Sequence, residues 1–249
     1  MTELTTAGGE SSRRLSLSSN MLKLIAVAAM VCDHFCVAFI TEEMVLLRYI
    51  GRIGFPIFCF LIAEGASKTR SVKRYLLRLI AFAFISEIPF DLMNHGEFIY
   101  LRYQNVFFTL AAGLFSVWML QLLQKKGGAY PLLAVFPLLI VTFCCVCLCT
   151  DYRTGGALSI FLFYLALQNK KHPEIYYPLL IAAIFAPCIS YSDYLRKFFW
   201  NKNEMGAVFA LPFLLLYNGE RGKVKINKYV FYAFYPAHLL LFAIIKILL

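Results

Sequence analysis

The stretch MLKLIAVAAMVCDHFCVAFI, residues 21–40, is a continuous apolar run that Asp33 and His34 interrupt near its middle. Its length matches the roughly 20 apolar residues that an α-helix needs to cross the hydrocarbon core of a bilayer. Ionisable side chains cost free energy inside lipid, so those that occur there usually face the interior of a helix bundle and serve a function. The stretch therefore predicts a membrane-spanning helix that carries a polar site.

The composition extends this interpretation to the whole chain. Of 249 residues, 61% are hydrophobic and 15% are charged, whereas soluble domains are nearer to half apolar and a quarter charged. The apolar runs are continuous and lack the alternation of a transmembrane β-barrel, and each span must satisfy its own backbone hydrogen bonds in lipid. We therefore predict an all-α polytopic membrane protein with about nine transmembrane helices in one bundle.

Two parts of the chain are expected. Residues 1–20 are polar and rich in Ser, Thr and Gly, which predicts a disordered cytoplasmic tail. Residues 21–249 are expected to form a single transmembrane domain, because the linkers between the apolar runs are short. The eighth run is short for a span, and its boundaries are the least defined. The predicted spans are 21–40, 46–66, 74–93, 105–124, 130–149, 152–168, 174–190, 205–217 and 229–248.

The uneven distribution of Lys and Arg sets the predicted orientation. With the N-terminus in the cytoplasm, 16 of the 24 basic residues fall on the cytoplasmic side, which fits the positive-inside rule. Anionic lipid headgroups account for the formal net charge of +10, and we expect no nucleic acid as a partner. The 16 residues are Arg13, Arg14, Lys23, Lys68, Arg70, Lys73, Arg74, Arg78, Lys125, Lys126, Lys170, Lys171, Arg221, Lys223, Lys225 and Lys228.

The eight cysteines do not predict a disulfide framework. Most of them lie within the predicted spans, where Cys is a normal small packing residue. A structural zinc site would need convergent ligands, and the sequence has no CxxC pair with a companion. We therefore expect these cysteines to pack, and we expect no metal.

Further polar side chains fall inside the predicted spans. Glu87 and Asp91 are four residues apart and share one helix face. Asp33 and His34 are adjacent, so their side chains point about 100° apart on a helix. We expect His34 to face a reaction chamber and Asp33 to contact a neighbouring helix through Arg52. The groups predicted to support the site or to face an acceptor on the outer side are Arg52, Glu87, Asp91, Asn105, Asp151 and His238.

A basic stretch, SKTRSVKRYLLR at residues 67–78, leads into the third predicted span. Its Arg and Lys side chains could bind the phosphates of a carrier such as coenzyme A at a cytoplasmic mouth, and a His beside a carboxylate can act as a general base. The alternatives are a positive-inside anchor for the basic stretch and a helix-packing pair for Asp33 and His34. The predicted cofactor-binding residues are Arg70, Lys73, Arg74 and Arg78.

Several motifs, in order along nearly the whole chain, resemble the TraX family. They are LKLIAVAAMVCDHFCVAF, LRYIGRIGFPIFCFLIAEGASKTRSVKRYLLRLIAFAFISEIPFDL, NVFFTL, LLLYNGERG and FYAFYPAHLLLF. The resemblance implies a membrane acetyltransferase linked to conjugation and to N-terminal acetylation of pilin, distantly related to the acyltransferase-3 group. It also implies that Asp33 and His34 are the catalytic pair, with Arg74 and Arg78 near the acyl-CoA.

The chain departs from the family pattern at residues 151–156. The resemblance leads us to expect Asp-Tyr-Gly-x-x-Gly, whereas the chain reads DYRTGG, so that Arg153 replaces the first Gly. If this outer loop touches the acceptor, the acceptor could differ from pilin.

The residues and the resemblance together predict an integral membrane acyltransferase in a bacterial cytoplasmic (inner) membrane. It would transfer acetyl from cytoplasmic acetyl-CoA, the acyl donor, to an amine or hydroxyl of a pilin-like or envelope glycan acceptor. Two other classes stay open. A proton-coupled transporter would also use intramembrane Asp, Glu and His, although we find no inverted repeat. A non-catalytic conjugation scaffold would only bind pilin.

Overall fold

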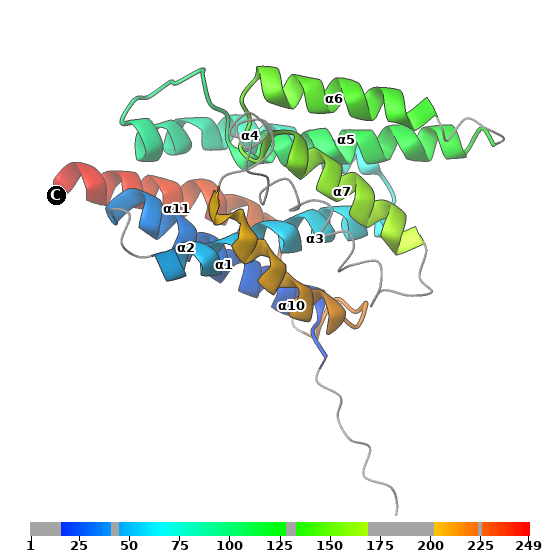
Figure 1. The fold of residues 1–249 in the computed structure, drawn as a ribbon, viewed down its shortest axis with the longest axis horizontal. Coiled ribbons are helices and arrows are strands. Elements are labelled where there is room, and N and C mark those ends of the chain that lie inside the picture. The colour runs from blue at the N-terminus through cyan, green and yellow to red at the C-terminus, as the bar shows by residue number, and fades with distance from the viewer. Residues whose placement is uncertain (1–15, 41–44, 128–132, 169–201, 224–225) are drawn as a thin grey trace, which may run out of the picture.

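Helices make up most of the described chain, and no strand occurs in it (Figure 1). The structure, a computed structural model, describes residues 16–40, 45–127, 133–168, 202–223 and 226–249. The helices are α1 (Ser19–Phe39), α2 (Val45–Arg52), α3 (Gly54–Lys68), α4 (Val72–His95), α5 (Val106–Gln124), α6 (Val135–Cys147), α7 (Arg153–Gln168), the 3₁₀ helix η2 (Lys202–Ala210), α10 (Leu211–Leu215) and α11 (Lys228–Leu248).

Four helical segments are long and apolar enough to cross a membrane, and they confirm an all-helical membrane protein. They are Ser19–Phe39, Leu46–Lys68, Val106–Gln124 and Tyr229–Leu248. Two other apolar helical segments are shorter, Val135–Cys147 and Gly206–Leu215. The predicted span at residues 174–190 lies outside the described residues. The count of nine spans and the cytoplasmic N-terminus therefore stay predictions.

The second predicted span, residues 46–66, corresponds to the single helical segment Leu46–Lys68. Within it, α2 ends at Arg52 and α3 begins at Gly54, and Ile53 between them keeps helical backbone angles. Two glycines allow α1 to approach closely here: a Cβ on Gly51 would lie 2.4 Å from Cβ of Asp33, and one on Gly54 would lie 2.8 Å from the carbonyl oxygen of Ala26. Small residues of this kind let helix backbones pack closely in membranes, and the approach holds α2 against the middle of α1.

One end of the bundle gathers basic residues, and we call it the basic end. Lys68, in the last turn of α3, donates to the carbonyl of Gly219 at 2.7 Å, and the backbone N–H of Ser19 donates to the carbonyl of Glu220 at 2.8 Å. These bonds bring the start of α1, the end of α3 and the segment before α11 together. The exposed basic residues at this end are Lys68, Arg70, Lys73, Arg74, Arg221 and Lys223.

The start of α1 overlaps the end of the stretch predicted as a cytoplasmic tail, residues 1–20. Ser18 caps α1 by accepting from the backbone N–H of Met21 at 3.4 Å. Leu17 donates to the carbonyl of Leu216 at 2.8 Å and accepts from the N–H of Asn218 at 3.0 Å. Residues 16–20 are therefore ordered against the segment that follows α10. The prediction for residues 1–15 lies outside the described residues.

The opposite end of the bundle holds the connections between α4 and α5 and between α6 and α7. Lys246, near the end of α11, donates to the carbonyl of Met93 at 3.1 Å. The N–H of Asp151 donates to the carbonyl of Gln104 at 2.8 Å, which joins the two connections. The end of α11 therefore lies beside the end of α4.

Packing of distant helices builds the interior. α11 packs against both α4 and α1, although it is the last helix of the chain. α3 contacts α1, α5 and α7, and α5 lies beside α6 (Figure 1). α1 and α11 therefore present side chains to the same space, and this contact positions the candidate site.

The predicted orientation can be tested with single cysteines at two exposed residues. Lys223 lies at the basic end, and Glu97 lies just after α4 at the opposite end. In a variant without native cysteines, we expect Glu97→Cys to react with an impermeant thiol reagent in intact cells and Lys223→Cys to react only after permeabilisation. Labelling of Lys223→Cys in intact cells would reverse the orientation and, with it, the proposed direction of acyl transfer.

Candidate functional site

Two histidines from opposite ends of the sequence meet between α1 and α11. Nδ1 of His34 lies 2.6 Å from Nε2 of His238, and the two rings stack with centroids 4.9 Å apart. His238 is 5% exposed and His34 is half-buried. The two imidazoles therefore form one hydrogen-bonded unit.

The partners of this pair fix which nitrogen is basic. Nδ1 of His238 lies 2.8 Å from the carbonyl oxygen of Phe234, and because a carbonyl only accepts, this nitrogen must carry a hydrogen. In a neutral His238, Nε2 then has the lone pair, so Nδ1 of His34 must donate to it. Nε2 of His34 is left with a lone pair, and this assignment makes it the basic atom of the unit.

Asp33 pairs with arginines of α2. Its Oδ1 lies 3.2 Å from Nη1 of Arg48, and its Oδ2 lies 3.7 Å from Nη1 of Arg52. Both Asp33 and Arg52 are buried. The contact with Arg52 is the one expected from the sequence, and Arg48 is an additional partner. Asp33 therefore holds α1 to α2 beside His34 and does not form a dyad with it.

The polar contacts continue from Arg52 to the loop that starts α7. Nη1 of Arg52 donates to the hydroxyl of Tyr152 at 2.9 Å. The hydroxyl of Tyr103 donates to Oδ1 of Asp151 at 3.0 Å, and Thr109 donates to the backbone carbonyl of the same residue. Burial raises the pKa of the Asp151 carboxyl to about 6, opposed by the charge of Arg52 and the hydrogen bond from Tyr103.

The departure from the family pattern falls on a strained backbone. Tyr152 and Arg153 have φ angles of 60° and 38°, in the left-handed region that favours glycine. The Gly that the resemblance leads us to expect at position 153 would adopt this conformation without strain. Tyr152 is held by stacking on Phe55, with ring centroids 3.5 Å apart.

The remaining predicted support residues of α4 and α5 make local contacts. Asn105 caps α5 by accepting from the N–H of Phe107 at 3.0 Å, and it donates to the carbonyl of Ala83 at 2.8 Å and to the carboxylate of Glu87. Asp91 accepts from the N–H of Tyr100 at 2.7 Å. In the described part of the chain, neither Glu87, Asp91 nor Asn105 contacts the histidine pair. They brace the connection between α4 and α5.

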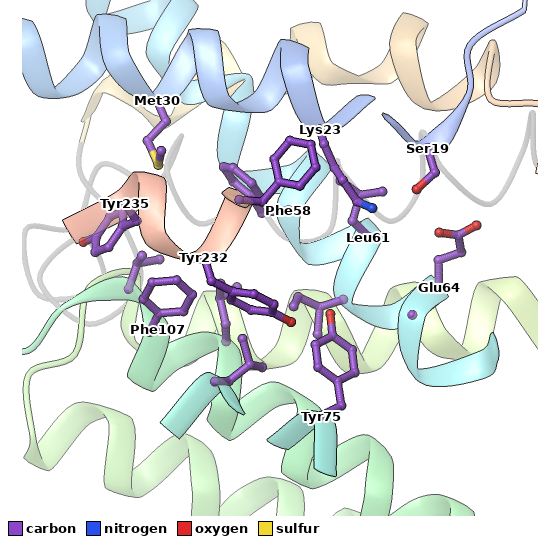
Figure 2. Close-up of a pocket in the computed structure, with 16 residues that line it drawn as sticks. Ser19, Lys23, Met30, Phe58, Leu61, Glu64, Tyr75, Phe107, Tyr232 and Tyr235 are labelled. Carbon is purple, nitrogen blue, oxygen red and sulfur yellow. The ribbon is translucent and has the colours of Figure 1, made fainter. Parts of the chain in front are cut away.

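A cavity of about 210 Å³ leads from the basic end toward the histidine pair (Figure 2). Ser19, Lys23 and Glu64 line one end, and Met30 and Tyr235 line the other. Between them the walls are mostly apolar. The other lining residues are Phe58, Leu61, Ile62, Gly65, Tyr75, Leu79, Val106, Phe107, Leu110, Phe231 and Tyr232.

Tyr235, at the inner end of the cavity, packs against both histidines. The ring of Tyr235 lies edge-on to His34, with centroids 5.8 Å apart, and to His238 at 5.7 Å. Met30 is one helical turn before His34 on α1. A molecule that enters at the basic end can therefore extend toward the imidazoles through an apolar passage.

Side chains at the entrance are fixed by a small polar cluster. The carboxylate of Glu64, which is 6% exposed, accepts from Nζ of Lys68 at 2.5 Å and from the hydroxyl of Tyr217. Lys23 places its Nζ 5.4 Å from the ring centroid of Phe231. The entrance thus holds ammonium groups beside one buried carboxylate.

The predicted cofactor-binding residues are divided by the structure. Arg70, Lys73 and Arg74 are exposed on the basic end, whereas Arg78 is half-buried. The guanidinium of Arg78 lies 5.5 Å from the ring centroid of Tyr75, a cavity residue. Of these four, Arg78 is therefore the one beside the cavity.

Sequence reasoning missed Lys23, Tyr75, Tyr232 and Tyr235 as site residues. A signal was present for Lys23, because Lys23, Met30 and His34 recur at seven and four residues and so share one face of α1. Tyr235 precedes His238 by three residues, which also places both on one helix face.

The possible metal ligands and the cysteines can be located in the described part of the chain. The described residues include no cluster of three or more His, Cys, Asp or Glu that could hold a metal ion. Seven cysteines lie in the described part of the chain, and each is a free thiol, with Cys36, Cys59 and Cys145 buried.

Comparison with known proteins gives the family. Residues 18–246 match the TraX protein family. The chain is also similar to the probable fimbrial assembly protein FimC, serogroup H1, of Dichelobacter nodosus, with 29% identity over 260 residues that cover 96% of this chain and 99% of the relative. No solved structure matches the chain. With the family match covering nearly all of the described helices, the chain belongs to the TraX family.

Proposed function

We propose that this protein is a membrane acyltransferase that transfers acetyl from acetyl-CoA to an amine or hydroxyl of a pilin-like or envelope glycan acceptor. The observation that carries the proposal is the apolar cavity that extends from the basic end to Tyr235, whose ring packs against the His34–His238 pair. In this proposal the protein resides in a bacterial cytoplasmic membrane with its basic end in the cytoplasm.

The basic end would bind the donor. Arg70, Lys73 and Arg74 offer exposed cations to the phosphates of coenzyme A, and Arg78 stands beside the cavity. Lys23 and His34 lie roughly 16 Å apart along the axis of α1, a length that an extended pantetheine arm can bridge. The apolar walls would exclude water from the thioester and so limit its hydrolysis.

His34 would act as the general base. Its Nε2 has the lone pair, because Nδ1 donates to His238 and His238 donates to Phe234. His34 would remove a proton from the acceptor as the acceptor attacks the thioester, and His238 would hold the ring in its reactive tautomer. Asp33, paired with Arg48 and Arg52, would keep α1 in register with α2.

The family and the relative support the choice of acceptor. The relative is described as a probable fimbrial assembly protein, and fimbriae are built from pilin subunits. An N-terminal amine of a pilin-like protein is therefore the first acceptor to test, with an envelope glycan hydroxyl as the second.

A non-catalytic assembly factor is the second candidate function. The observation in its favour is that the relative is known as a probable fimbrial assembly protein. It predicts pilin binding without covalent change, whereas the enzyme predicts a new amide or ester on the acceptor.

The deciding experiment measures the transfer of a labelled acetyl group from acetyl-CoA to the acceptor. Inverted membrane vesicles that contain the protein and the host's pilin are incubated with acetyl-CoA carrying a ¹⁴C-acetyl group, next to vesicles that lack only this protein. We expect label on pilin or on an envelope glycan only when the protein is present. Pilin that associates with the protein but gains no label would favour the assembly factor and reject the enzyme.

A variant of the basic end tests donor binding separately. We expect Arg74→Gln/Arg78→Gln to raise the KM for acetyl-CoA roughly tenfold while changing kcat little, because contacts to the carrier phosphates lie far from the reacting atoms. Arg102→Gln is the matched control, an exposed arginine at the opposite end. An unchanged KM together with less protein in the membrane would mean that the arginines only anchor the topology.

A further inference from the structure

Tyr235 carries a buried hydroxyl whose hydrogen the fold does not use. The residue is 3% exposed, the backbone N–H of Val106 faces its hydroxyl oxygen, and the hydroxyl donates to no group in the described part of the chain. Leaving a buried hydrogen-bond donor unpaired costs stability. An unsatisfied group of this kind calls for an explanation, and a bound substrate is one.

The position of Tyr235 indicates which part of a substrate it would meet. Figure 2 shows Tyr235 with Met30 at the end of the cavity opposite Ser19 and Glu64. Phe107, His34 and His238 pack edge-on against its ring, with centroids 5.1, 5.8 and 5.7 Å away. Rings on several sides hold the tyrosine in place, so its hydroxyl is positioned before any substrate arrives.

From this geometry we infer that Tyr235 is a further catalytic residue, whose hydroxyl donates a hydrogen bond to the carbonyl oxygen of the donor thioester. The inference rests on the proposed function, because it assumes that the thioester reaches the histidine end of the cavity. A donor aimed at the oxygen where negative charge develops stabilises the transition state more than the ground state.

Tyr235 would assist the transfer of acetyl from the thioester sulfur to the acceptor amine. The acceptor nitrogen bonds to the thioester carbonyl carbon, and its proton passes to Nε2 of His34. The carbonyl electron pair moves onto oxygen, where the hydroxyl of Tyr235 stabilises it. When the carbonyl reforms, the carbon–sulfur bond breaks, and the leaving thiolate takes the proton from His34 to give free coenzyme A.

Other polar groups of the cavity are placed less well for this role. Lys23 and Glu64 line the entrance, at the end away from the histidines. Tyr75 and Tyr232 lie between the two ends and nearer the entrance than Tyr235 (Figure 2). Tyr235 is thus the tyrosine of the cavity whose ring packs against His34 and His238.

The experiment compares Tyr235→Phe with Tyr229→Phe in the full-length protein in proteoliposomes. Tyr229 is a 48% exposed tyrosine on the same helix and does not line the cavity. The substrates are ¹⁴C-acetyl-CoA and a peptide with the N-terminal segment of the host's pilin. We expect Tyr235→Phe to lower kcat by roughly 10²–10³-fold, with the KM for acetyl-CoA and the thermal unfolding temperature unchanged. Tyr229→Phe should match the wild type.

The other possible results of the Tyr235→Phe experiment separate this inference from the proposed function. A wild-type kcat in Tyr235→Phe would overturn the inference and leave the acyltransferase proposal standing. A loss of activity that comes with a lower unfolding temperature would make Tyr235 a packing residue and also overturn it. If the wild-type protein transfers no acetyl from acetyl-CoA, the proposed function fails and this inference fails with it.

Discussion

Replacing His34 by alanine is expected to lower acetyl transfer by roughly 10²–10⁴-fold, the range that a positioned general base supplies. The reason is that Nε2 of His34 is the nitrogen left with a lone pair in the hydrogen-bonded unit. Acyl-CoA binding and membrane insertion should be preserved, because the basic end is unchanged. The measurement is single-turnover transfer from labelled acetyl-CoA, with His95→Ala, an exposed histidine outside the site, as the control.

Variants of His238 separate the two histidines. His238→Gln keeps an amide that can donate to Phe234 and accept from His34, whereas His238→Ala removes both bonds. We therefore expect the glutamine variant to retain more activity than the alanine variant, and both to retain more than His34→Ala. If His238→Ala abolishes transfer while His34→Ala does not, the base is His238. If neither matters, the pair only packs and the enzyme is rejected.

Asp33→Asn is expected to destabilise the protein by about 3 kcal/mol, because it leaves the buried Arg52 and the partly buried Arg48 without their carboxylate. Removing one partner of a buried ion pair costs more stability than the intact pair contributes, because the remaining charge is buried without a counter-ion. The measurement is unfolding of the purified protein in detergent, with the exposed Glu97→Gln as the control.

A triple variant sharpens this test. Adding Arg48→Gln and Arg52→Gln to Asp33→Asn removes the stranded charges, so part of the lost stability should return. Wild-type stability in Asp33→Asn alone would mean that α1 and α2 are held by the close approach at Gly51 and not by the ion pairs.

The sequence predicted those helices whose apolar runs are long and end in clear caps. The predicted spans 21–40, 105–124 and 229–248 match α1, α5 and α11 within two residues at each end, and Asn105 and Asn227 cap the last two. Apolar length and caps are local properties, so the sequence is sufficient for them.

Contacts between distant segments were not predictable in the same way. The close approach of Gly51 and Gly54 to α1 depends on tertiary packing, and such an approach leaves no periodic signal. His34 and His238 are 204 residues apart in sequence, and only the packing of α11 against α1 brings them together. The contact of Asp33 with Arg52 was the exception, because charged groups inside a bundle must find partners.

The pairing of Leu17 with the segment after α10 has a practical consequence for tagging and imaging. It fixes the chain just ahead of α1 at the side of the entrance lined by Ser19. A reporter inserted directly before Leu17 would therefore begin beside the entrance and compete for space with a large nucleotide carrier. Leu249 is 94% exposed, and its helix ends beside Met93 at the other extremity of the bundle. Fluorescent or affinity handles belong at that terminus, where they leave the entrance clear.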